Sequence, residues 1–207
     1  NNKLFWHGIN LMELAAKYGA PSKVNVFEED NKIRINLLSY DSDGSLTNKV
    51  SNVLRQNIAE YLSEYRMIND YIETEVAEII DLGFEIDVIL DKNVNQTEII
   101  SSILSEVSSY LEIDGRDLGE HLYVGELKQI VNSQSGVVNL VDLRVINKVG
   151  EGYSDTKTAQ PYIDEDTKQI QLGDETVYMR SNQIYQVRFP SKDIVVRVKT
   201  ISAPLIN

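Results

Sequence analysis

The sequence contains no cysteine, and it has only two histidines and one tryptophan among 207 residues. The absence of cysteine excludes disulfide bonds, thiolate metal ligands and cysteine nucleophiles together. Basic residues are also scarce, because 20 Lys and Arg stand against 32 Asp and Glu and leave a formal net charge of −12. Lys and Arg are scattered singly along the chain, and a phosphate backbone would be repelled by such a surface. We therefore expect no nucleic-acid partner.

Long hydrophobic runs are missing as well. The apolar stretches are short and interrupted by charged residues, so we expect neither a transmembrane helix nor a membrane partner. Apolar residues still make up 42% of the chain and charged residues 25%, which is typical of a folded domain. The chain starts at Asn1 without a methionine or a signal-peptide pattern, and we expect it to be a fragment or a cleavage product.

Helical and strand patterns alternate in the first half of the chain. The spacing of apolar residues predicts a helix over Asn10–Tyr18, a strand over Val24–Phe27 and a half-buried strand over Ile33–Leu37. A longer helix follows, with its predicted apolar face made of Val50, Val53, Leu54, Ile58, Tyr61, Leu62 and Tyr65.

The next strand, Ile80–Leu90, alternates between apolar and mostly acidic residues. One face of this strand should pack against helices, and the other should meet water or a partner. The carboxylates expected along that face or edge are Glu73, Glu75, Asp81, Glu85 and Asp87. They favour two interpretations equally: a solvated face that keeps the chain soluble, or a surface that docks a basic partner.

Three further elements complete the first region. Asn95 is a predicted N-cap, with Glu98 at the capping-box position, for a helix that extends to Leu111. A short helix over Val124–Val131 and an apolar strand over Val137–Ile146 follow. The sequence thus predicts an α+β fold, in which residues 1–150 form a two-layer domain with helices packed on a mixed sheet.

The pattern changes at residue 150, where two glycines in three residues predict a linker or a long turn. Short apolar strands separated by turns follow, and they predict a small β-hairpin-rich region over residues 151–207. The expected strand residues are Ile170, Leu172, Val177, Met179, Ile184, Val187, Phe189, Ile194, Val196 and Val198.

The chain also contains an internal echo. The strand Ile33–Leu37 with the helix Val50–Leu62 matches Leu82–Ile86 with Ile99–Leu111 at a constant shift of 49, since 82 − 33 and 111 − 62 are both 49. Glu13-Leu14 and Val24 recur as Glu126-Leu127 and Val137, because 126 − 13 and 137 − 24 are both 113. The sequence therefore predicts a duplicated strand–helix core with a helix–strand unit before it and another after it. Two copies are too few for a solenoid.

Candidate catalytic residues are few. His7 lies beside Phe5 and Trp6, and His121 lies near Glu120 and Asp117, either of which could orient an imidazole. No Gly-x-Ser-x-Gly or comparable element accompanies them, so a solvent-facing loop histidine is the favoured interpretation. We assign no catalytic residue and expect the protein not to be an enzyme.

Metal and cofactor sites are not predicted either. Asp41–Ser45 resembles the start of a calcium loop, but Asn52 stands where the closing glutamate would be needed, so a turn is favoured. Gly115, Gly119 and Gly125 lack the Gly-Lys-Ser/Thr element that would cradle a phosphate.

Tyrosine is the abundant aromatic residue, with 11 copies. Those of the predicted helices, Tyr61, Tyr65 and Tyr110, belong mostly to the core. The others lie in or near the β-rich region, where they suit a contact surface or simply the strand propensity of tyrosine: Tyr153, Tyr162, Tyr178 and Tyr185.

Three segments carry a family resemblance: Glu60–Asp70, Asp81–Val88 and Gly136–Leu143. Together with the order of helices and strands from Leu11 to Ser154, they resemble the baseplate wedge proteins of contractile-tailed, T-even-like bacteriophages, within the baseplate J-like family. The resemblance rests on pattern and hydrophobic spacing.

The resemblance implies a non-enzymatic structural role for a C-terminal fragment of a longer wedge protein. Such a protein pairs with a second copy, binds other wedge subunits and links wedges into a ring around the tail hub. Its implied location is the tail baseplate of a virion, assembled in the host cytoplasm. The alternative function is a carbohydrate- or receptor-binding module of a tail or adhesin protein, which would use tyrosine-rich hairpins.

Overall fold

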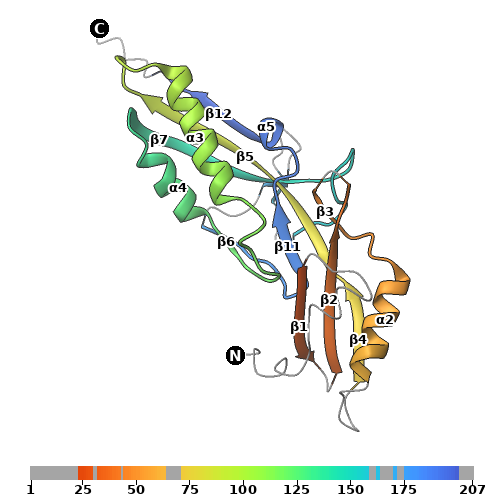
Figure 1. The fold of residues 1–207 in the computed structure, drawn as a ribbon. Helices are drawn as coiled ribbons and strands as arrows, with labels where there is room; N and C mark the ends of the chain where they lie inside the picture. The colour runs from red at the N-terminus through yellow and green to blue at the C-terminus, as the bar shows by residue number, and fades with distance from the viewer. Residues whose placement is uncertain are drawn as a thin grey trace. The chain divides into compact units, whose positions relative to one another are not determined.

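The computed structural model describes residues 23–29, 32–42, 44–63, 71–158, 162–163, 170–171 and 175–200. Helices combine with mixed and antiparallel sheets, so the α+β class is confirmed (Figure 1). No helix in these ranges is long and apolar enough to cross a membrane. The expected helix over Asn10–Tyr18 and the candidate His7 lie outside the described residues.

The chain groups into two compact units, and neither is continuous in sequence. The first comprises Asn1–Ile79, Arg116–Glu120 and Met179–Ile184, and the second comprises Ile80–Gly115, His121–Tyr178 and Tyr185–Asn207. The division at residue 150 remains a prediction about which parts fold independently.

The first unit contains a sheet with one helix on it. Strand β2 (Lys32–Tyr40) pairs antiparallel with β1 (Lys23–Glu29) and with the short β3 (Leu46–Thr47). Strand β4 (Tyr71–Val76) lies parallel to β2. Helix α2 (Asn52–Ser63) precedes β4 in the chain and packs against it. A parallel neighbour requires such a crossover connection, which accounts for the helix between the two strands.

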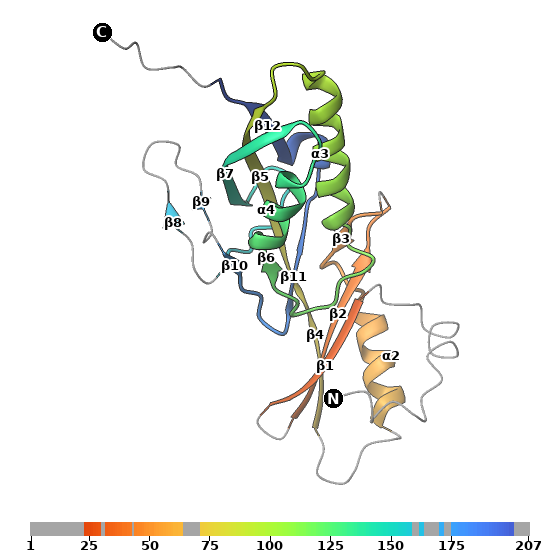
Figure 2. The ribbon, with the colours of Figure 1, turned by 90° about the vertical axis from the view of Figure 1, so that its left-hand side faces the viewer.

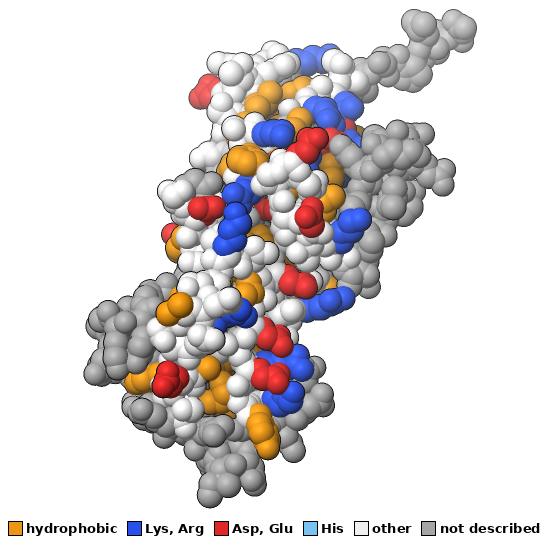
Figure 3. All heavy atoms as spheres, turned by 90° about the vertical axis from the view of Figure 1, so that its right-hand side faces the viewer, with side chains coloured by type: hydrophobic (Ala, Val, Ile, Leu, Met, Phe, Trp, Pro, Cys, Tyr) orange, Lys and Arg blue, Asp and Glu red, His pale blue; other side chains and the backbone are white. Residues whose placement is uncertain are grey.

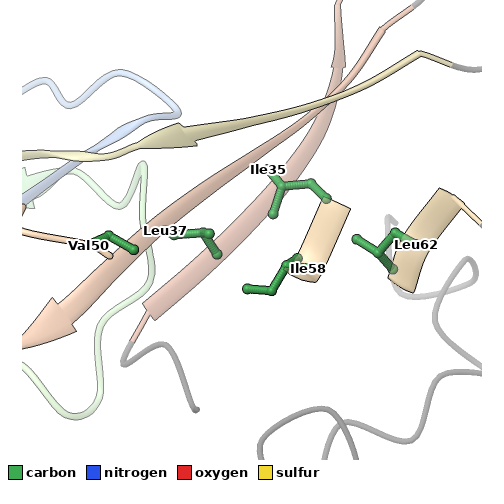
Figure 4. Close-up of a cluster of buried hydrophobic side chains, with 5 residues drawn as sticks. All are labelled: Ile35, Leu37, Val50, Ile58 and Leu62. Carbon is green, nitrogen blue, oxygen red and sulfur yellow. The ribbon is translucent and has the colours of Figure 1, made fainter. Parts of the chain in front are cut away.

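The core of this unit lies between α2 and the sheet (Figure 4). Its buried members are Ile35, Leu37, Val50, Ile58 and Leu62. The hydroxyl of Ser51 accepts a hydrogen bond from the Val53 N–H at 3.2 Å, which caps the start of the helix. Val53 was expected on the apolar face, but 63% of it is exposed, so that placement is wrong. It lies in the first turn, where the helix has only begun.

The second unit is organised around β5 (Glu78–Leu90). Strand β7 (Val137–Lys148) pairs antiparallel with β5, and β12 (Ile194–Val198) pairs parallel with it. The sheet has six strands, in which β11 (Gln183–Gln186) also neighbours β5 and β9 (Ile170–Gln171) neighbours β7.

Helices α3 (Gln96–Tyr110) and α4 (Val124–Asn132) contact each other, and they lie against β12 and β7 respectively (Figures 1 and 2). The predicted N-cap is confirmed, because the Asn95 side chain accepts a hydrogen bond from the Thr97 N–H at 3.2 Å. The core of the unit is fully buried. It consists of alternate residues of β5, namely Leu82, Phe84, Ile86 and Val88, and of the helix residues Ile103, Val107, Leu127 and Val131.

The strands after residue 160 form only partly where they were expected, and most pair with distant partners. Met179, Val187 and Phe189 were expected in strands but lie in none, so those placements are wrong. The strand at Tyr162–Ile163 was not expected. Strands β8 (Tyr162–Ile163) and β9 pair antiparallel with each other. By contrast, β10 (Thr176–Val177) pairs with β6 (Leu122–Tyr123), and β12 follows the short helix α5 (Pro190–Asp193) to join β5.

Candidate interaction surface

Glu85 of β5 is neutralised by arginines from two neighbouring strands. The Glu85 carboxylate accepts hydrogen bonds from both terminal nitrogens of Arg197 on β12, each at 3.0 Å. Arg144 on β7, which lies directly opposite Glu85, approaches it to 2.8 Å. The hydrogen bond from Arg197 and the positive charges of both arginines hold the pKa of Glu85 below its usual value.

Asp87 extends this arrangement along the strand. Its carboxylate lies 3.2 Å from the Lys199 ammonium and 4.0 Å from Arg144, and Arg144 also contacts Asp142 at 3.1 Å. We call the set of Glu85, Asp87, Asp142, Arg144, Arg197 and Lys199 the ionic ladder. Its three acidic and three basic members balance in charge, and Figure 3 shows side chains of both signs interleaved on the face that it draws.

The carboxylates of β4 are also paired. Glu73 lies 2.6 Å from the Lys32 ammonium, and Glu75 lies 3.6 Å from Arg34. The hydrogen bond from Lys32 lowers the pKa of Glu73. The interpretation of these acidic residues as a docking surface for a basic partner stays a prediction, but these ion pairs offset the negative charge on which it rested. The partners that neutralise them come from neighbouring strands of the same chain.

Asp81, the remaining acidic residue of the set, is completely buried. Its carboxylate accepts hydrogen bonds from the Ser154 backbone N–H at 2.5 Å and from the Gln186 amide at 2.8 Å. Burial raises the pKa of Asp81, and these two donors partly offset that effect. The segment of residues 150–155, expected to be a linker or a long turn, is thus attached to β5 through Ser154.

A second buried carboxylate lies in the same part of the unit. Asp193 is 2% exposed, and it accepts hydrogen bonds from the Tyr153 hydroxyl at 2.6 Å and from the Phe189 backbone N–H at 2.8 Å. Burial and this bond to Asp193 raise the pKa of Tyr153. The sequence predicted a contact or strand role for Tyr153. In the structure its hydroxyl connects the turn to helix α5 through Asp193.

Two bulges interrupt the pairing of β7 with β5. The register skips Val141 between Asp142 and Leu140, and it skips Val138 between Asn139 and Val137. Both skipped valines are exposed, Val138 by 62% and Val141 by 49%. Bulges redirect side chains and are common at strand edges and functional surfaces. They place two apolar side chains in solvent on one strand.

The paired strands β6 and β10 carry an aromatic surface. Tyr123 is 50% exposed and Tyr178 is 59% exposed, while Leu122 and Val177 are buried. The His121 and Tyr178 rings meet edge to face, with 5.2 Å between their centroids. These three aromatic residues, His121, Tyr123 and Tyr178, form what we call the aromatic patch.

The other candidates from the sequence take structural roles. Asp41 forms the predicted turn, since its side chain accepts from the Ser42 N–H at 2.7 Å and its carbonyl from the Gly44 N–H at 3.0 Å. Glu120 accepts from the Asp117 N–H at 3.1 Å. Within the described ranges, no group of three His, Asp or Glu side chains could hold a metal ion.

Sequence reasoning missed Arg144 and Arg197 as the partners of Glu85. One signal was available: each is a single charged residue inside an otherwise apolar strand segment, Leu143–Ile146 and Ile194–Val198. An arginine in such a position needs a counter-ion on a neighbouring strand. Gln186 and Ser154, which bind Asp81, gave no comparable signal.

Comparison with known proteins identifies the fold. No family model matches the chain, and no curated protein matches it significantly. A chain from the cryo-EM structure of the anti-feeding prophage (AFP) baseplate, six-fold symmetrised, matches with a TM-score of 0.50 and 10% sequence identity. The match covers 88% of this chain and 37% of the other, so the present chain spans a little over a third of that protein. The chain thus has a fold similar to that of a chain in this baseplate.

Proposed function

We propose that the chain is part of a structural, non-enzymatic subunit of a phage-like tail baseplate, and specifically of a baseplate wedge. The observation that carries the proposal is the fold similarity to the AFP baseplate chain, which extends over 88% of the present chain. The sequence resemblance to wedge proteins supports the same class of assembly.

In this role the protein contacts a second copy of itself and other wedge subunits, and it links wedges into a ring around the tail hub. The exposed valines of β7 support a contact surface, because a partner that covers Val138 and Val141 would remove their apolar area from water. The charge-balanced ionic ladder suits packing against a protein better than binding of a polyanion. The site of action would be the tail baseplate of a virion or related particle assembled in the host cytoplasm.

Sedimentation velocity tests the self-association. We expect the chain to form dimers at micromolar concentration, and we expect the double substitution Val138→Asp and Val141→Asp to give monomers. Val53→Asp is the matched control, because Val53 is equally exposed but lies on α2. A wild-type chain that stays monomeric would refute the homodimer.

Cross-linking mass spectrometry on the parent particle tests the wedge role separately. We expect cross-links between this chain and other baseplate subunits. Cross-links confined to a tail fibre or to the tail tube would contradict the assignment.

The aromatic patch favours the second candidate, a carbohydrate-binding module. Exposed tyrosine rings such as Tyr123 and Tyr178 can stack on sugar rings while their hydroxyls form hydrogen bonds. A glycan array tests this function: binding that is lost in Tyr123→Ala and kept in Tyr71→Ala, a somewhat more exposed tyrosine on β4, would favour it. An array without any bound glycan would remove this candidate.

A further inference from the structure

We propose that Asp81 and Gln186 form a proton-binding site, and that proton uptake there tightens the packing of the turn at Tyr153–Thr158 and of the segment Gln186–Asp193 on β5. Asp81 is 0% exposed and Gln186 is 1% exposed. The two carboxylate oxygens bind different parts of the chain, since Oδ1 accepts from Gln186 Nε2 and Oδ2 accepts from the Ser154 N–H. One carboxyl group therefore joins three segments.

The Gln186 amide can offer Asp81 either a donor or an acceptor. Its Oε1 atom is buried and has no hydrogen-bond partner among the residues that the structure describes. Rotation of the amide by half a turn exchanges Nε2 and Oε1, which places an acceptor opposite Asp81 Oδ1. A protonated Asp81 then donates its O–H to Gln186 Oε1 and still accepts from Ser154 through Oδ2. Asp81 can thus keep one hydrogen bond on each oxygen in both protonation states. The rotation exchanges one unpaired amide atom for the other, since Nε2 then occupies the position that Oε1 held.

Neighbouring strand β7 reinforces the same junction. Asn147, 3% exposed, donates to the Asp81 carbonyl at 3.2 Å and accepts from the Thr158 N–H at 3.0 Å. The turn is therefore attached at both of its ends, to Asp81 through Ser154 and to Asn147 through Thr158. A change of charge on Asp81 acts directly on these buried attachments.

The charged and titratable surroundings of Asp81 are mixed. Burial is the main effect that favours the proton, and the negative charge of Asp193 on α5 adds to it. The positive charge of Arg188 opposes it. The groups that face this region from the packed elements are Lys148 on β7, Tyr153 in the turn, Arg188 after β11, and Lys192 and Asp193 on α5.

The proposal fixes the sign of the pH dependence. An acid whose pKa is higher in the folded state binds a proton there before the unfolded chain does. Stability then rises as the pH falls through the folded-state pKa, and it levels off below the ordinary pKa near 3.8. Within that window the unfolding equilibrium constant falls up to tenfold for each pH unit of acidification, because the folded state holds one extra proton.

The test measures urea unfolding of the full chain between pH 7.5 and 4 for the wild type, Asp81→Asn and Asp142→Asn. Asparagine at 81 mimics the protonated acid, since its Oδ1 accepts from Ser154 and its Nδ2 donates to Gln186 Oε1. We expect Asp81→Asn to remove the acid-side gain. Asp142→Asn, which changes an acidic residue with a half-exposed side chain on β7, should keep it. Identical pH profiles for the wild type and Asp81→Asn overturn the proposal.

A carbon-detected NMR titration of the Asp81 carboxyl in the wild-type chain covers the case in which the variant does not fold. A midpoint above 3.8 supports the site, and a midpoint at or below 3.8 overturns it. Neither measurement depends on the baseplate role, so failure of one leaves the other unaffected.

Discussion

At the residue scale, Gly136 shows how a single backbone position controls the start of β7. Its φ is +92°, and a Cβ atom added there would lie 3.1 Å from Ile99 Cδ1 and 3.2 Å from Val94 Cγ1. Its carbonyl also accepts a hydrogen bond from the Asp91 N–H at 3.0 Å, which ties the end of β5 to the start of β7. Only glycine adopts this backbone conformation without strain.

We therefore expect Gly136→Ala to lower the free energy of unfolding by about 1–3 kcal/mol. Gly125→Ala is the matched control, because Gly125 lies in α4 and a Cβ atom there meets nothing within 4 Å. The control should be neutral or stabilising by up to about 1 kcal/mol, since alanine favours a helix. Urea denaturation compares the two variants, and an equal effect of both would contradict the role given to Gly136.

At the element scale, the ionic ladder determines how β12 attaches to β5. Arg197 binds Glu85 with two hydrogen bonds and also lies 3.9 Å from Asp87. The Lys199 backbone N–H donates to the Val88 carbonyl at 2.8 Å, which continues the attachment beyond the strand. A one-residue slip of β12 would turn Arg197 to the other face of the sheet. The ladder therefore favours the observed register.

Glu85→Gln tests this attachment through its pH dependence. Because the pKa of Glu85 is lowered in the folded state, its stabilisation is present above the ordinary value near 4.5 and is lost as the pH falls through the folded-state pKa. We expect the variant to be less stable than the wild type by about 0.5–1 kcal/mol at neutral pH, since Arg197 is partly exposed.

That difference should shrink below pH 4.5 and also in high salt. The exposed Glu60→Gln on α2 serves as the control and should leave stability nearly unchanged. Urea denaturation at several pH values measures both variants. A difference that grows on acidification would show that the Arg197–Glu85 pair does not hold β12.

The elements also show which parts of the structure a sequence can predict. Helix α3 was predictable because its cap at Asn95 and its apolar spacing are local. The alternation in β5 correctly predicted a strand, but it could not show that Arg197, 112 residues away, would neutralise Glu85. The parallel pairing of β12 and the burial of Asp81 likewise depend on contacts that leave no local pattern. Non-local charge partners were the missing information.

At the scale of the whole molecule, the predicted repeat has a structural counterpart in both units. Ile35, Leu37, Ile58 and Leu62 are buried in the first unit, and the residues 49 positions later, Phe84, Ile86, Val107 and Leu111, are buried in the second. Equivalent positions on a strand and its following helix thus form a core twice. This agreement supports the duplication, which remains a prediction about the origin of the fold.

The discontinuous units predict how the chain responds to truncation at residue 150. In a fragment of residues 1–150, Phe84–Val88 lose β12, and Asp81 loses both Ser154 and Gln186. The cluster between α2 and its sheet, including Ile58, lies entirely before residue 80 and keeps its own members.

We therefore expect amide exchange to accelerate about tenfold or more on the side of β5 that faced β12, and to change less in α2. Hydrogen–deuterium exchange with residue resolution compares the fragment with the full chain. The pairing of β7 with β5 serves as the internal reference, because both strands are present in the fragment. Full protection of Phe84–Val88 in the fragment would instead support an independent domain that ends at residue 150. The exchange pattern thus distinguishes a domain that ends at residue 150 from two units that are each built from several separate segments of the chain.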